Sequence, residues 1–111
     1  MIEGSKRTFT AGADLAAHRR VKLSGTSVVY AGDEEDAIGV TEFAALLGED
    51  ITVRLINTGG TFEVTAAGAI AAGGAVYPAA DGKVEATGTN AKGTALDAAT
   101  ADGDIIECLL K

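Results

Sequence analysis

The chain has 111 residues and a mass of 11.1 kDa, which is the size of a single domain. It is 47% hydrophobic but only 5% aromatic, and its formal net charge of −7 argues against a surface that binds phosphate backbones. One cysteine and one histidine exclude an internal disulfide framework and a classical zinc site. No apolar run reaches the roughly 18 residues that cross a bilayer, and residues 1–9 lack the apolar core of a signal peptide.

Basic residues are concentrated at the start of the chain. Five of them fall within the first 22 residues: Lys6, Arg7, Arg19, Arg20 and Lys22. Acidic residues dominate the remainder. This asymmetry predicts a molecule that could orient on a charged surface, although the same charges would also keep a domain rich in alanine and glycine soluble.

Short β-branched stretches separated by turn residues recur along the chain. They predict strands at residues 27–30, 38–41, 51–56, 61–65, 75–77, 83–87 and 104–110. Gly, Asp and Asn separate nearly all of them, as at Asp81-Gly82 and Asp102-Gly103, and supply the positive φ that tight hairpins need. Strands at this spacing predict an all-β sandwich or barrel with little helix.

Two alanine-rich stretches compete with an all-β interpretation. Thr41–Gly48 is predicted to be a short helix, because threonine can cap its start, glycine can end it and alanine is the best helix former. For residues 66–72 the sequence allows two predictions, a second helix or a loop or bulged strand. The glycines within and after that stretch favour the loop or bulged strand.

The sequence is also similar to itself at an offset of about 54 residues. Residues 51–56 fall on 105–110 and residues 37–40 on 91–94, and one further residue of shift places Leu15 on Ile70. Two degenerate copies are therefore predicted, at residues 1–56 and 57–111. Because each is too small to bury a core alone, we expect one domain that covers residues 1–111.

The groups that most often carry catalysis do not form a recognised site. His18 stands beside Arg19 and Arg20, which disfavour its protonated form, and it is expected to be a solvated loop residue. Residues 88–94 fail as a phosphate-binding loop because Lys92 is not followed by Ser or Thr. Cys108 lies in the last apolar strand and is expected to be a buried, inert thiol. We therefore predict no cofactor and no enzymatic activity.

The acidic run Asp33–Asp36 is the remaining candidate site. It follows a glycine, as a solvated turn would, but carboxylate oxygens are also the ligands that Ca²⁺ prefers. The run lacks the alternating ligands and the glycine of an EF-hand loop. It leaves open an alternative function, a carbohydrate- or calcium-binding β module on a virion or cell surface.

The order of residues resembles that of the phage capsid cement, or head-decoration, proteins. The resemblance covers nearly the whole chain and rests on Ala-Gly-Ala-Asp-Leu at 11–15, Ala-Ile-Gly-Val at 37–40, Ile-Thr-Val-Arg-Leu at 51–55 and Asp-Gly-Lys-Val at 81–84. A more distant similarity to lambda-type head-decoration proteins implies a small β-tulip or β-barrel-like domain.

This resemblance implies a structural virion protein. It would bind the major capsid protein on the outside of an expanded capsid, at three-fold and quasi-three-fold positions, as a homotrimer that stabilises the shell. It would be made in the host bacterial cytoplasm and have no nucleic-acid or membrane partner. Residues 1–10 would form an N-terminal arm that becomes ordered on binding.

Contact residues are expected on two surfaces. Capsid contacts are expected at Ile2, Lys6, Arg7 and Phe9 in the basic start. Trimer or strand-edge contacts are expected at Phe43, Phe62, Ile105 and Leu109, which are large apolar residues or lie in the closing strand.

Overall fold

The computed structural model describes residues 6–56 and 61–110, and these form ten short strands. The only helical element in these two ranges is a single 3₁₀ turn, Ala80–Gly82. The predicted all-β, barrel-like fold with little helix is therefore confirmed.

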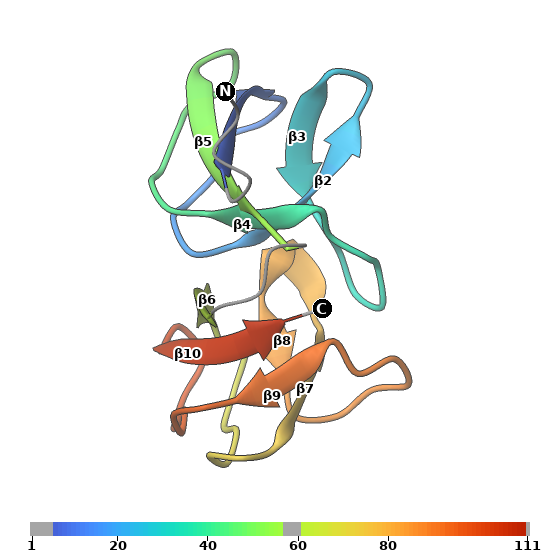
Figure 1. Ribbon diagram of the computed structural model, residues 1–111, viewed down its shortest axis with the longest axis vertical. Helices are drawn as coiled ribbons and strands as arrows, with labels where there is room; N and C mark the ends of the chain where they lie inside the picture. The colour runs from blue at the N-terminus through green and yellow to red at the C-terminus, as the bar shows by residue number, and fades with distance from the viewer. Residues whose placement is uncertain (1–5, 57–60, 111) are drawn as a thin grey trace.

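The first half of the chain forms a closed barrel (Figure 1). Its strands are β1 (Lys6–Ala11), β2 (Arg20–Ser24), β3 (Ser27–Tyr30), β4 (Gly39–Thr41) and β5 (Asp50–Leu55). They are hydrogen-bonded in the order β1-β3-β2-β4-β5. β1 runs antiparallel to β5 along nearly its whole length, and it closes the barrel by pairing in parallel with β3 at Thr10 and Ala11.

The second half repeats this order in an open sheet. Its strands are β6 (Thr61–Thr65), β7 (Ala75–Pro78), β8 (Val84–Glu85), β9 (Gly93–Ala95) and β10 (Ile105–Leu110). The closed barrel, read from β1 in the other direction, has the order β1-β5-β4-β2-β3. The order of the second sheet, β6-β10-β9-β7-β8, matches it strand for strand. β8 and the end of β6 approach only at one parallel bridge, between Ala66 and Val84, so this sheet stops short of a closed barrel.

Equivalent backbone hydrogen bonds occur in the two halves. Leu15 and Ala45 exchange a pair of backbone bonds, and Ile70 and Ala99 do the same. The next turns also match, because the amide of residue 48 donates to the carbonyl of residue 11 as that of residue 103 does to residue 66. The repeat is thus visible in the backbone as well as in the sequence.

The structure corrects the register of the repeat in its last strand. The sequence comparison sets 51–56 on 105–110, whereas the structure matches Asp50–Leu55 with Ile105–Leu110. Thr10 pairs with Asp50, and its counterpart Thr65 pairs with Ile105. A shift of one residue exchanges the two faces of a strand. The sequence comparison, which matched apolar residues, therefore aligned inward-facing residues of one copy with outward-facing residues of the other.

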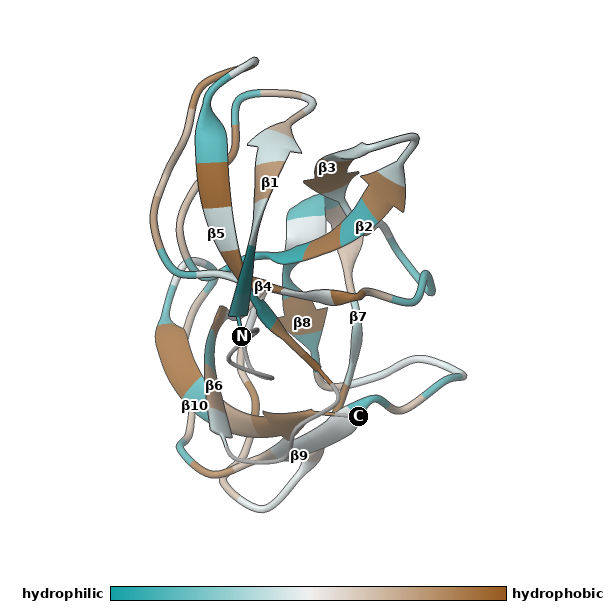
Figure 2. Ribbon diagram, turned by 45° about the horizontal axis from the view of Figure 1, so that its top comes forward, coloured by the Kyte–Doolittle hydropathy of each residue, from teal (hydrophilic) through white to brown (hydrophobic). Residues whose placement is uncertain are grey.

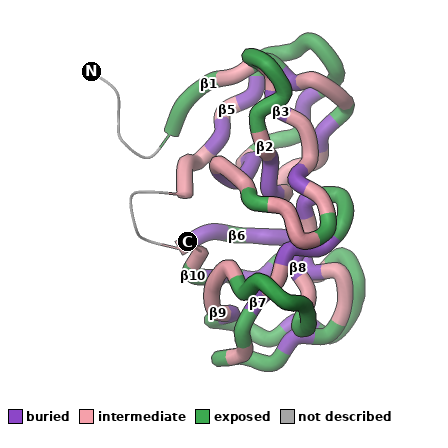
Figure 3. The backbone as a smooth tube through the Cα atoms, turned by 90° about the vertical axis from the view of Figure 1, so that its right-hand side faces the viewer, coloured by how far each residue is buried: buried purple, intermediate pink, exposed green. Residues whose placement is uncertain are grey.

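Each half has a lean core of small β-branched side chains. Val21, Val28 and Val53 are fully buried in the barrel, and Val64 and Val76 are fully buried in the second sheet. Figure 2 shows the apolar segments that these strands contribute, and Figure 3 shows exposed loops at both ends of the long axis. β4 also contributes Val40 to the second core, so the halves share apolar contacts.

Arg20 on β2 joins the two halves through its buried guanidinium. Nε donates to the carbonyl of Lys83 at 3.0 Å and Nη2 to that of Ala79 at 2.9 Å, both in the second half. Nη1 and Nη2 also donate to the carbonyls of Glu35 and Gly32. Burial lowers the pKa of Arg20 to about 10, which leaves the side chain charged at neutral pH.

The helix predicted at Thr41–Gly48 does not form. Thr41 ends β4, Ala45 bridges to Leu15, and Gly48 takes a positive φ of 89° in the turn before β5. Eight residues make a marginal helix, and pairing of the buried Ala45 with the neighbouring loop outweighs the helix propensity of alanine. Residues 66–72 likewise form a loop with two isolated bridges, as their glycines suggested.

Half of the expected N-terminal arm belongs to the barrel. Lys6–Thr10 pairs with β5 from Arg54 to Asp50, so these residues are a barrel strand in this structure rather than an arm. The remaining arm residues, including Ile2, lie outside the described residues.

Candidate docking surfaces

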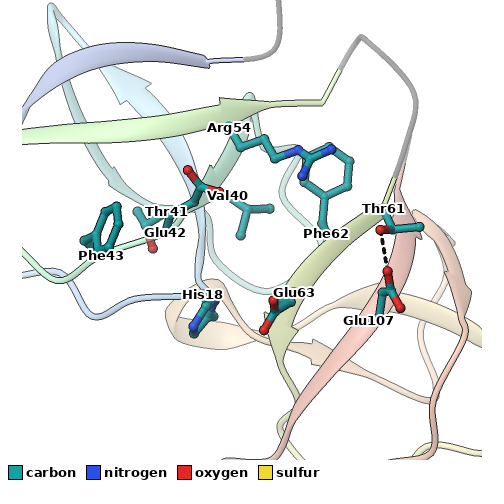
Figure 4. A pocket seen from close by; sticks show the side chains of 10 residues that line it. All are labelled: His18, Val40, Thr41, Glu42, Phe43, Arg54, Thr61, Phe62, Glu63 and Glu107. Atoms are coloured by element: carbon teal, nitrogen blue, oxygen red, sulfur yellow. Dashed lines mark hydrogen bonds between the residues drawn. The ribbon is translucent and has the colours of Figure 1, made fainter.

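A crevice of about 250 Å³ separates the barrel from the second sheet (Figure 4). Its wall holds Arg54, whose guanidinium lies 4.9 Å over the ring of Phe62. The opposite wall carries Glu63 and Glu107, which face each other directly across β6 and β10. Like charges in such positions repel. The crevice is therefore a surface of mixed charge, and it does not have the arrangement of a catalytic site with a paired general acid and general base.

The basic strand β1 lies beside this crevice and is largely exposed. Nζ of Lys6 pairs with a carboxylate oxygen of Glu42 at 2.9 Å. Arg7 is exposed and lies 5.0 Å over the ring of Phe9, which is half-buried against the barrel core. The structure thus places the predicted contact residues Lys6, Arg7 and Phe9 together on one strand, in a cation–aromatic arrangement.

Three of the four apolar contact candidates are exposed. Phe43 is 69% exposed, whereas Ile105 and Leu109 are about half exposed on the outer face of β10. Phe62 is 2% exposed because it packs in the second core, so its side chain is not presented to a partner. β10 lies between β6 and β9. It offers a face to a partner and no free edge, which corrects the expectation of strand addition there.

A second hollow, of about 460 Å³, was not anticipated from the sequence. It is lined by Leu15, Tyr30 and Leu46, and the adjoining Leu47 is 67% exposed. The helix predicted at Thr41–Gly48 gives no indication that Leu46 and Leu47 are exposed. The exposed surface became recognisable only when the loop conformation was known.

The acidic run is divided between two environments. Asp33 and Glu34 lie with Glu85 in a group whose carboxylate oxygens are within 4.8 Å of one another. Partial burial, followed by a hydrogen bond with Asp33, raises the pKa of Glu85. Glu35 instead accepts bonds from Lys22 and from the amide of residue 32, both at 2.6 Å, and these lower its pKa.

Asp36 is also engaged outside that group, because it pairs with Lys92. The candidate calcium ligands are therefore Asp33, Glu34 and Glu85 rather than the contiguous run. Sequence spacing could not show this, since Glu85 comes from β8 in the other half of the chain.

The two remaining candidates behave as structural residues. Cys108 is fully buried on β10, and burial raises the pKa of its thiol to about 11. His18 is a half-exposed loop residue with a φ of 61°, and its backbone bonds link Thr41 to Thr65. The expectation of a buried thiol is confirmed, and both residues lie where the fold requires backbone or core contacts.

A family model described as phage cement protein matches residues 3–110. The chain belongs to the phage cement protein family. The structure is also similar to the head fiber gp8.5 N base of bacteriophage phi29, with a TM-score of 0.81 and 17% identity over 96% of this chain and 92% of that one. A search of curated proteins gave no match. At this identity the second likeness shows a shared fold.

This cement protein therefore has a structural, capsid-associated role in a phage virion. Its family is one of structural proteins and not an enzyme class. In the two ranges that the structure describes, no helix is long and apolar enough to cross a membrane.

Proposed function

We propose that this cement protein binds the outside of an expanded phage capsid at three-fold and quasi-three-fold positions, as a homotrimer, and stabilises the shell. The observation that carries the proposal is the family match along nearly the whole chain. The fold is consistent with it, because two fastened β units with exposed basic and apolar surfaces suit docking. The partner is the major capsid protein, and the protein is made in the host cytoplasm and ends on the outer virion surface.

The basic strand supplies the proposed capsid contact. Lys6, Arg7 and Phe9, together with Ile2, would meet an acidic region of the shell, while the net charge of −7 directs most of the remaining surface away from it. Contacts from one copy would be weak. Three linked copies convert weak contacts into avidity, with a gain on the order of 10²–10⁴.

The proposed trimer contacts are Phe43, Ile105 and Leu109. Each is a large, exposed apolar side chain on a molecule with few aromatic residues. Burial of such side chains between copies is the usual source of affinity in homo-oligomers. Phe43 borders the crevice of Figure 4, and the other two flank Glu107 on the outer face of β10.

Co-sedimentation with purified shells tests the proposal. The protein is expected to bind expanded shells and not immature ones, and to raise the temperature at which expanded shells break open. The single variants Lys6→Glu and Arg7→Glu should each bind more weakly, and Lys22→Glu on β2, which changes the net charge by the same amount, serves as the control. Molar salt should reduce occupancy; unchanged occupancy in molar salt would refute the electrostatic part.

The alternative, a carbohydrate- or calcium-binding module, rests on the group formed by Asp33, Glu34 and Glu85. Calcium would then raise the melting temperature, and Asp33→Asn would abolish that rise. Asp36→Asn is the matched control, because Asp36 pairs with Lys92 outside the group. A calcium-dependent rise together with absent shell binding would favour this alternative over the cement role.

A further inference from the structure

The hollow beside Leu46 is an apolar groove with an acidic rim. Its floor is made by Leu15, Tyr30 and Leu46, which come from the two loops joined by the bridge between residues 15 and 45, and from the end of β3. Asp14 and Glu49 are exposed at its edge and line the same groove. Their oxygens accept the amides of residues 47 and 46, at 2.9 and 2.7 Å, which fixes the loop that carries the two leucines.

The second half of the chain provides an internal control for these leucines. The amide of residue 49 donates to the carbonyl of Leu46, and that of residue 104 donates in the same way to Ala101. Leu46 and Leu47 therefore correspond to Ala101 and Asp102. The same turn folds with a small and an acidic side chain, so the turn itself does not require two leucines. At 62% and 67% exposed, they have little part in the core either.

The rim charges indicate the chemistry of the occupant. Within residues 6–56 and 61–110, neither Asp14 nor Glu49 has a cationic partner, and the groove lining contains no lysine or arginine. An apolar side chain flanked by a lysine or arginine would complement both the floor and the rim.

A second copy of the chain is a poor source of that cation. Among the described residues, Lys6, Lys22, Lys83 and Lys92 are each held in an ion pair, and Arg20 is buried. The other described arginines, Arg7, Arg19 and Arg54, each lie over an aromatic ring of their own chain. Each further copy also brings a net charge of −7, which opposes contact at an acidic rim. These observations favour a different protein as the source of the complementary surface.

We propose that this groove receives an apolar side chain flanked by a lysine or arginine from the capsid protein. The inference rests on the proposed cement function and adds a second contact to it. The ion pair between Lys6 and Glu42 holds the loop of the groove beside β1, and the amide of residue 48 donates to the carbonyl of Ala11 at the far end of that strand. One partner can therefore touch the basic strand and the groove together.

The test measures binding of variants to purified expanded shells. Leu46→Ala/Leu47→Asp copies the residues of the equivalent turn, so the fold should be kept, as an unchanged melting temperature would verify. Half-saturation is expected to need about tenfold more protein or higher, since one buried leucine contributes at least that factor. Leu23→Ala, which alters an exposed leucine on β2, is the control and should bind like the wild type.

A second variant tests the rim charges separately from the turn. Asp14→Asn/Glu49→Gln keeps the oxygens that accept the amide bonds but removes both negative charges. It should bind several-fold more weakly, with a smaller dependence on salt.

The remaining outcomes count against the inference. Unchanged shell binding by the leucine variant would overturn it, and so would loss of self-association with shell binding retained, because a second copy would then occupy the groove. If these variants bind normally while the wild type sediments with expanded shells, the inference fails and the proposed function stands. Wild-type protein that does not bind expanded shells would refute both.

Discussion

The guanidinium of Arg20 donates to the carbonyl oxygen of Ala79 at 2.9 Å, and this bond joins a barrel strand to the second sheet. Further carbonyls from both halves surround the same side chain. The two copies of the repeat are therefore fastened by a charged group whose bonds go to main-chain acceptors. Its counterpart in the second half is Ala75, so the fastening is not part of the repeat itself.

Replacing Arg20 should weaken the whole molecule. Arg20→Met leaves several buried carbonyls without a donor, so the free energy of unfolding is expected to fall by about 3 kcal/mol. Urea denaturation followed by fluorescence or circular dichroism measures this change. Lys22→Met, which removes an exposed ion pair on the same strand, should cost at most about 1 kcal/mol. Equal losses in the two variants would show that Arg20 has no special role.

Two glycines at equivalent positions of the repeat are required for strand pairing. A Cβ at Gly39 would lie 2.3 Å from the carbonyl oxygen of Arg54, and one at Gly93 would lie 1.7 Å from that of Leu109. Both clashes are with backbone, so Gly39→Ala and Gly93→Ala should each cost about 3 kcal/mol by overpacking. Gly68→Ala is the control, because nothing lies within 4 Å of its added methyl group. Thermal melts that rank Gly68→Ala with the other two would contradict this account.

The pH dependence of stability should reveal how partial burial and the neighbouring carboxylates act on Glu85. The pKa of Glu85 is raised in the folded state. Its contribution to the free energy of unfolding is therefore fully present below the ordinary glutamate pKa, and it is lost as the pH rises through the folded-state pKa. Asp33→Asn removes a neighbouring charge and should raise the melting temperature at about pH 7 more than at about pH 4. An equal shift at both pH values would exclude the electrostatic cause.

The thiol of Cys108 should be protected from reagents. It is fully buried and its pKa is raised to about 11, so a maleimide should react only as the chain unfolds, with a rate that follows urea concentration. The repeat supplies the matched variants, because Val53 occupies the equivalent position. Cys108→Val should change stability by less than about 1.5 kcal/mol, whereas Cys108→Ser buries a hydroxyl and should cost about 1–3 kcal/mol. Rapid labelling of the native protein would contradict the burial.

Much of the fold was predictable because its signals are local. Ser27–Tyr30 and Thr61–Thr65 are predicted and observed with the same bounds, since β-branched residues bounded by turn residues specify short strands. The repeat was visible for the same reason. The register of the repeat in its last strand was not predictable. Ile105–Leu110 is apolar on both faces, so the residue types alone do not show which face is buried without the partner strand.

The docking surfaces were predictable only in part. The basic strand carrying Lys6 and Arg7 follows from charge alone, and Phe43 was named for its size. The exposure of Leu46 and Leu47 depends on a loop held by Glu49, which lies three residues from Leu46, and by Asp14, which lies 33 residues from Leu47. Long-range contacts of this kind leave no periodic signal.

In each half the first strand pairs with the last, and this pairing has a consequence for how the chain is made. β1 pairs with β5, and β6 with β10, so every barrel strand has its neighbours as soon as Leu55 leaves the ribosome. The acceptors that Ala79 and Lys83 offer to Arg20 are translated later. Domains generally fold in the order of their synthesis. The N-terminal half can thus fold first, and the second half then folds against it. The guanidinium of Arg20 stays hydrated until the second half supplies its acceptors.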